Sequence, residues 1–123
     1  MVERGIKGAF HHMETKTKEC NTYWAKIYMA GDIDVAKQTC REFCMTGLCV
    51  NIYETDYIYT MGEEAGFCVE LVNYPRFPTE SRLIINKATE LADLLMQRCF
   101  QGSYSLMTPE NTYWVTRREG DKD

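Results

Sequence analysis

The spacing of apolar residues along this chain switches from alternate positions to helical positions, and the switch occurs twice. Residues 24–30 alternate between apolar and mixed positions, which predicts a strand with one buried side. Apolar residues over about 33–45 instead follow helical spacing. Asp32 precedes that stretch as an N-cap, and Gly47 follows it where helices end in a left-handed residue. The sequence therefore predicts a strand followed by a helix.

A pair of strands is expected next. Residues 48–60 predict a long strand with a candidate bulge around 54–56. Residues 62–66 combine glycines with acidic residues and predict the hairpin loop. Residues 67–73 alternate again and predict the returning strand, which Pro75 brings to an end.

The second helical stretch covers about 80–100, with Thr79 placed to cap it. Residues 103–107 and 112–116 then predict two short strands. The buried side of this helix is predicted to consist of five residues at helical spacing, namely Ile84, Ala88, Leu91, Leu95 and Cys99.

The resulting order of elements is strand, helix, strand, strand, helix, strand, and one extra strand. This order predicts an α+β fold, a ferredoxin-like βαββαβ sandwich whose antiparallel sheet carries both helices on one face. The chain has 123 residues, enough for one domain, which we place at 23–118. Residues 1–22 are expected to form a polar tail, and 119–123 a frayed end.

The sheet face away from the helices carries more aromatic residues than a plain solvent-exposed face needs. Large apolar surfaces of this kind mark interaction sites. We therefore expect the protein to form a homo-oligomer through this face. The residues predicted on it are Trp24, Tyr28, Tyr53, Tyr57, Tyr59, Cys68 and Val72.

Charge and cysteine content limit the partners and the compartment. The formal net charge is −4, which argues against binding to a DNA or RNA polymer. No apolar run approaches the ~18–20 residues that a membrane span needs, and no signal peptide is evident. We therefore expect a cytoplasmic protein whose six cysteines are reduced.

No familiar catalytic arrangement is present in the sequence. Both histidines, His11 and His12, fall in the polar tail, and no glycine-rich phosphate loop occurs. The acidic pair Glu63 and Glu64 falls in the predicted hairpin loop, where neighbouring side chains diverge into solvent. We therefore expect neither catalytic residues nor a cofactor.

Three cysteines are close enough in sequence to be weighed as metal ligands. Cys40 and Cys44 share one side of the first helix, and Cys49 follows on the next strand. Three thiolates at this spacing suit zinc or copper(I). Small residues packed against a sheet explain the same pattern, and we favour that explanation over a metal site.

Two segments combine aromatic rings with arginine. Tyr74, Arg76 and Phe77 lie in a proline-stiffened turn just before the second helix. The second set follows at the C-terminal end, and it consists of Trp114, Arg117 and Arg118. Rings stack on bases and guanidinium groups bind phosphate, so both sets are predicted to bind a small anionic ligand. The alternative is a structural turn and a charged chain end.

Part of the chain resembles the CutA divalent-cation-tolerance family. The resemblance is carried by Val35-Ala36-Lys37, by Leu48-Cys49-Val50-Asn51-Ile52, and by Ile58-Tyr59-Thr60-Met61-Gly62-Glu63. It implies a trimeric ferredoxin-like fold and a role in binding divalent metal. The chain departs from the family where Met61 replaces a tryptophan, and it lacks a His-Pro-Tyr-Glu-Val-Pro stretch after the second helix.

These observations predict a non-catalytic oligomer that sequesters a small anionic ligand, such as a nucleotide or a cyclic nucleotide second messenger. Its size, its aromatic and arginine segments and its lack of a known active site are similar to those of viral proteins that phages use as anti-defence sponges. The alternative function is a CutA-like trimer that binds divalent metal. A third is an enzyme whose site is not recognisable from sequence.

Overall fold

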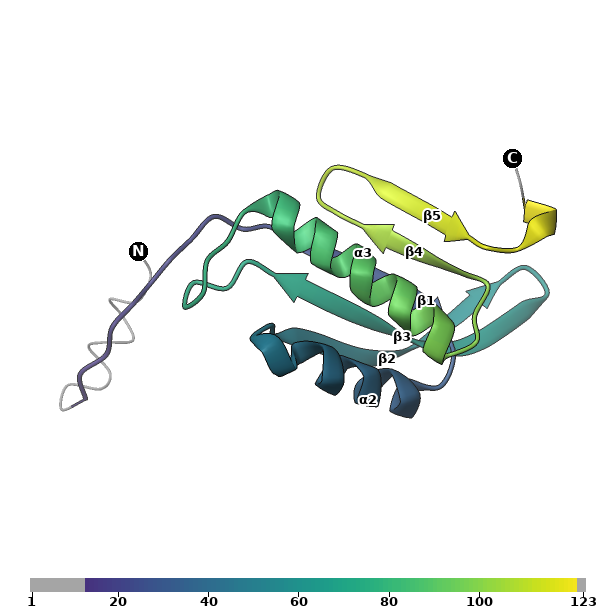
Figure 1. The fold of residues 1–123 in the computed structure, drawn as a ribbon, viewed down its shortest axis with the longest axis horizontal. Coiled ribbons are helices and arrows are strands. Elements are labelled where there is room, and N and C mark those ends of the chain that lie inside the picture. Colours follow the sequence, from purple (N-terminus) through teal and green to yellow (C-terminus); the bar gives the residue numbers. More distant parts are fainter. Residues whose placement is uncertain (1–12, 122–123) are drawn as a thin grey trace.

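The computed structural model describes residues 13–121. Five strands form one sheet, and two helices cover the same face of it (Figure 1). Residues 1–12 of the expected tail lie outside the described part, as do His11 and His12. The elements are β1 (Trp24–Ala30), α2 (Ile33–Phe43), η1 (Cys44–Thr46), β2 (Val50–Tyr59), β3 (Gly62–Val72), α3 (Ser81–Arg98), β4 (Ser103–Met107), β5 (Thr112–Thr116) and η2 (Glu119–Asp121).

The strand order in the sheet is β2-β3-β1-β4-β5, and every neighbouring pair is antiparallel. This is the predicted ferredoxin-like α+β arrangement, extended at one edge by β5. The fold-class prediction is therefore confirmed. The bounds predicted for the two C-terminal strands, 103–107 and 112–116, also match the structure.

The hydrophobic core lies between the helices and one face of the sheet. In β1 and β3 it takes every second residue, as alternation along a strand requires. All five residues predicted on the buried face of the second helix are buried. The sheet residues at the centre of this core are Ala25, Ile27, Met29, Phe67, Val69 and Leu71.

Capping fixes the ends of the first helix as predicted. The Asp32 carboxylate accepts a hydrogen bond from the Asp34 amide at 2.8 Å, and Gly47 adopts a φ of 109° after the 3₁₀ turn that follows α2. At the second helix the prediction was wrong. Glu80 is the N-cap of α3 and makes no side-chain capping bond, while the Thr79 amide donates to the Asn73 side chain at 2.8 Å.

The hairpin between β2 and β3 differs from the prediction. The strands pair without interruption through Thr55 and Gly66, so no bulge is present around 54–56. The turn consists of Thr60 and Met61, whose φ is 68°, and residues 62–66 belong to β3. Because β1 ends opposite Gly66, the paired residues 56–65 continue beyond it as a two-stranded extension, which we call the hairpin arm.

Gly66 serves a close approach between strands. The Tyr57 hydroxyl donates to the Phe67 carbonyl at 2.6 Å and accepts from the Met29 amide at 3.1 Å, so it joins β3 to β1. A Cβ atom at Gly66 would overlap the Met29 carbonyl oxygen and lie 2.6 Å from a ring carbon of Tyr57. Position 66 therefore requires glycine, because a side chain there would clash with its neighbours. The sequence alone assigned this glycine wrongly to a turn.

Replacing Gly66 with alanine is expected to destabilise the protein by about 2 kcal/mol or more, because backbone and the Tyr57 ring must both shift. Gly120→Ala is the matched control, since an added Cβ there meets nothing within 4 Å. Urea unfolding of both variants measures the effect. Equal stability of Gly66→Ala and Gly120→Ala would contradict this account of the hairpin.

Candidate functional site

The open face, the sheet face opposite the helices, carries a row of side chains that crosses all five strands. Its members are paired by the strand register, which places Tyr53 opposite Cys68, Cys68 opposite Tyr28, Tyr28 opposite Ser105, and Ser105 opposite Trp114. Three of these five residues are aromatic. The aromatic character predicted for this face is therefore present in the structure.

A polar cluster occupies the next row of the open face. The Glu70 carboxylate accepts hydrogen bonds from the Tyr53 hydroxyl at 2.9 Å and from the Asn51 amide at 3.4 Å. Lys26 forms an ion pair with Glu70 at 3.7 Å and lies over the Trp24 ring at 4.9 Å from its centroid. Each charge in this cluster thus has a partner of opposite charge or a ring face.

The thiol of Cys68 is buried even though it belongs to the open face. Burial raises the pKa of this thiol. The pKa of Tyr28 is also raised, mainly by burial and to a smaller extent by the neighbouring charge of Cys68. The pKa of Tyr53 is raised as well. The largest cause is its hydrogen bond with Cys68, and burial and the hydrogen bond to Glu70 add to it. At neutral pH these groups keep their protons, so they can donate hydrogen bonds but do not act as bases.

A hollow of about 160 Å³ opens beside this row, at the end of β1 and the base of the hairpin arm. We call it the sheet-face pocket. The side chains that give it chemical character are Tyr28, Tyr57, Glu64, Trp114 and Arg118. Three ring systems, one carboxylate and one guanidinium group therefore border the same hollow. This combination suits a planar ring with charged groups, and a hollow of this size encloses only part of a cofactor-sized ligand.

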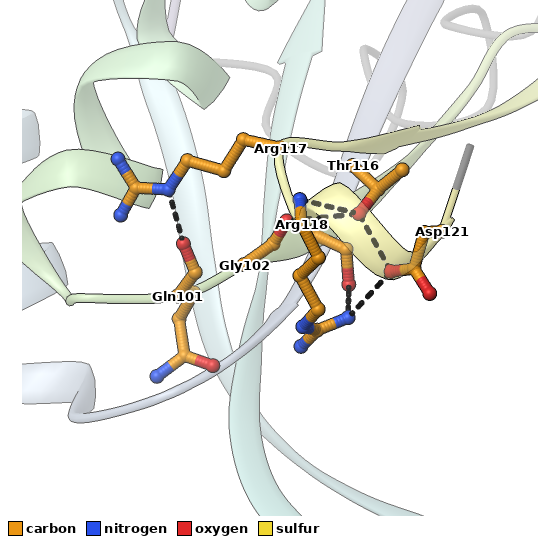
Figure 2. A network of polar contacts seen from close by, with 7 residues as sticks. Gln101, Gly102, Thr116, Arg117, Arg118 and Asp121 are labelled. Carbon is orange, nitrogen blue, oxygen red and sulfur yellow. Dashed lines mark hydrogen bonds and ion pairs between the residues drawn. The ribbon is translucent and has the colours of Figure 1, made fainter.

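Arg117 and Arg118, both predicted to bind a ligand, make hydrogen bonds within the chain (Figure 2). The Arg117 side chain donates to the backbone carbonyls of Gln101 at 3.0 Å and Met96 at 3.2 Å. It thus supplies hydrogen bonds to carbonyl groups at and after the C-terminal end of α3. Arg118 donates to the Ser103 hydroxyl at 3.1 Å and pairs with Asp121 at 3.4 Å. Of the two, only Arg118 borders the sheet-face pocket.

The structure does not bring the two predicted ligand-binding sets together. Tyr74, Arg76 and Phe77 precede the first residue of α3, whereas Arg117 contacts its last turn. An 18-residue helix is about 27 Å long, so the sets lie at opposite ends of the molecule. Trp114 and Arg118 share the sheet-face pocket with residues that the sequence did not mark as functional.

Sequence reasoning missed Glu64 because it placed this residue in a solvated loop. Tyr28 and Tyr57 were assigned to the open face but not to a site. The signal that was available is the alternation of the hairpin: Glu64 pairs directly with Tyr57 once the strand is continued to Gly62. A continuous strand therefore directs Glu64 towards the aromatic face.

The cysteines near α2 do not assemble a metal site. Cys40 is buried, and burial raises the pKa of its thiol to about 11. Burial and then the charge of Cys49 raise the pKa of Cys44. Among residues 13–121, no group of three or more histidine, cysteine or acidic side chains is placed to hold a metal ion. The favoured explanation of a packed helix face fits Cys40, whereas Cys49 is exposed.

No family model matches this chain. A search of curated proteins also finds no match. Two solved structures share its fold. A phage SAM lyase in the apo state is 14% identical, with a TM-score of 0.63, over 85% of this chain and 98% of the lyase. A phage SAM lyase in complex with S-methyl-5'-thioadenosine is 13% identical, with a TM-score of 0.55, over 85% of this chain and 96% of that one.

These similarities correct the functional prediction. The chain was expected to be a non-catalytic sponge for a nucleotide, but the proteins that share its fold over nearly their whole length are enzymes. These structures contradict the expectation that it is not an enzyme. Both similar chains come from phages, in agreement with the expected viral character. Within residues 13–121, no helix is long and apolar enough to cross a bilayer.

The raised pKa values on the open face predict a loss of stability at alkaline pH. Phenols that ionise less readily in the folded state stabilise it below their ordinary pKa of 10.0, and this stabilisation is lost as pH rises through their folded pKa. The free energy of unfolding should therefore fall from about pH 9 to about pH 11, and less steeply in Tyr53→Phe. Urea unfolding across this range measures both slopes; identical slopes would contradict the arrangement around Tyr53.

Proposed function

We propose that this protein is an enzyme that cleaves S-adenosylmethionine and releases S-methyl-5'-thioadenosine. The fold it shares with the phage SAM lyases supports this proposal, since the similarity covers 98% of one lyase chain. The observation that carries it for this chain is the sheet-face pocket, where Glu64 stands among the rings of Tyr28, Tyr57 and Trp114.

The proposed reaction breaks the bond between the sulfonium sulfur and the γ-carbon of the methionine part. The bonding electron pair goes to sulfur, which becomes a neutral thioether in S-methyl-5'-thioadenosine. The γ-carbon, which has lost its bond to sulfur, gains a new bond in one of two ways. The substrate's own carboxylate displaces the sulfur and closes a lactone, or a proton leaves the neighbouring carbon and an alkene forms. Both routes balance without a cofactor or a second substrate.

The charges of the pocket suit such a substrate. A sulfonium ion is attracted by a carboxylate and by the faces of aromatic rings, which Glu64 and the three rings provide. The exposed ring of Trp114 offers a stacking surface for adenine. The half-exposed guanidinium of Arg118 is available to the substrate carboxylate on the side that Asp121 leaves open.

The protonation states on the open face bear on the route. Tyr28 borders the pocket and keeps its proton at neutral pH, so it supplies a hydrogen bond to the substrate rather than a base. Glu64 then remains as the carboxylate that borders the pocket. Displacement of the sulfur by the substrate's own carboxylate requires no proton transfer, whereas the alkene route would use Glu64 as its base.

The test is incubation of the full chain with S-adenosylmethionine, followed by mass-spectrometric detection of S-methyl-5'-thioadenosine. Glu64→Gln should lower kcat/KM about tenfold to a hundredfold, the range expected for one charge-assisted contact. Glu63→Gln is the matched control, since its neighbouring carboxylate does not border the pocket. S-adenosylmethionine that the parent protein returns unchanged would overturn the proposed activity, and equal rates in the two variants would overturn the role of Glu64 in it.

We also propose that a second copy of the chain covers part of the open face. Tyr53 and Val72 are 42% and 40% exposed there, and Tyr59 of the hairpin arm, on the same face, is 53% exposed. Burying such residues contributes about 25 cal/mol per Å² of apolar area. An isolated two-stranded hairpin is at best marginally stable in water, so a neighbouring molecule would also stabilise the arm.

Light scattering at micromolar concentration should therefore give a mass that is a multiple of 14.3 kDa. Val72→Asp should shift the mass towards the monomer, because a charge would be buried in the contact. Met45→Asp is the control: Met45 is 83% exposed and follows α2, away from the open face. A parent mass of 14.3 kDa would overturn the proposed association.

A further inference from the structure

The N-terminal segment and the turn that follows β3 lie at the end of the molecule opposite the hairpin arm (Figure 1). Three cationic side chains border a hollow there. The hollow measures about 360 Å³ and lies between the N-terminal segment and the turn that follows β3. We call it the cationic corner, and its residues are Lys16, Lys18, Tyr74, Pro75 and Arg76. It shares no residue with the sheet-face pocket.

Buried Asn73 holds the two sides of this corner together. Its side-chain amide donates to the Asn21 carbonyl at 2.7 Å, and its side-chain oxygen accepts from the Thr79 amide at 2.8 Å. Its own backbone amide donates to the Tyr23 carbonyl at 2.9 Å. The N-terminal segment is thus fixed to the turn at Asn21 and Tyr23, a few residues after Lys18, which keeps the two sides of the corner close together.

Among the residues that the structure describes, the cations of the corner lack acidic partners. Within residues 13–121, the ion pairs involve neither Lys16, Lys18 nor Arg76. Two acidic residues of the same segment, Glu14 and Glu19, do not border the hollow. In a chain of net charge −4, three unpaired cations around one hollow create a local site for anions.

Two exposed aromatic rings adjoin these cations. The rings of Tyr74 and Phe77 stack with centroids 6.1 Å apart and an interplanar angle of 25°. The Arg76 guanidinium lies over the Phe77 ring, 5.6 Å from its centroid. Tyr74 is 45% exposed and Phe77 62%, so both keep surface on which a planar base can stack.

We propose that the cationic corner binds a nucleoside polyphosphate, with its phosphates at Lys16, Lys18 and Arg76 and its base against Tyr74. Lysine and arginine bind phosphate oxygens, and neighbouring rings add stacking. The hollow has the size of a small-ligand pocket. The negative net charge favours a free nucleotide over a nucleic-acid strand, whose binding needs phosphate contacts along an extended basic surface.

The experiment is calorimetric titration of the full chain with ATP and with inorganic tripolyphosphate. Arg76→Ala and Lys18→Ala should each weaken ATP binding, by about tenfold or more for Arg76→Ala. Arg41→Ala removes the same charge from an exposed arginine outside the corner and should bind ATP like the parent. Tripolyphosphate should bind more weakly than ATP and show the same dependence on Arg76, because it lacks a base.

Glu64→Gln should bind ATP like the parent, which separates this site from the proposed active site whatever the outcome of the cleavage assay. Two results would overturn the proposal. One is an ATP affinity that is the same in Arg76→Ala and Arg41→Ala. The other is Arg76-dependent binding of a single-stranded oligonucleotide of ten thymidines without binding of ATP, which would identify a nucleic-acid surface instead.

Discussion

The antiparallel register between β1 and β3 is the constraint on which the rest of this structure depends. It sends Phe67 and Val69 into the core beneath the helices and Cys68 and Glu70 to the open face. A slip of one residue would exchange these two sets and bury a carboxylate among apolar side chains. The Tyr57 hydroxyl, which joins the two strands above Gly66, marks the point where this register ends and the hairpin arm begins.

Much of the fold was predictable because alternation and helical spacing are local signals. The final two strands and the buried side of α3 follow directly from them. The hairpin could not be predicted in this way, since glycine is compatible both with a turn and with a close approach between strands. Only the position of Tyr57 over Gly66 distinguishes these uses, and Tyr57 is nine residues away in sequence. The misplaced turn then hid Glu64 from the candidate site, and Arg117 gave no sign that it satisfies the end of α3.

The functional prediction failed for a related reason. It took the absence of a nucleophile, a histidine base or a phosphate loop as the absence of catalysis. A sulfonium substrate already contains its leaving group, and its own carboxylate lies within reach of the reacting carbon. An enzyme for such a substrate needs mainly to hold it in a reactive conformation. In the proposed site, rings, one carboxylate and phenols that retain their protons would meet that need, and none of them forms a sequence motif.

A crystal structure of this protein with S-methyl-5'-thioadenosine tests the central claim most directly. The account predicts that the nucleoside lies in the sheet-face pocket, with its adenine against Trp114 and its sulfur near the Glu64 carboxylate. Binding of the nucleoside at any other place, with the sheet-face pocket left to solvent, would contradict the assignment of this pocket as the active site.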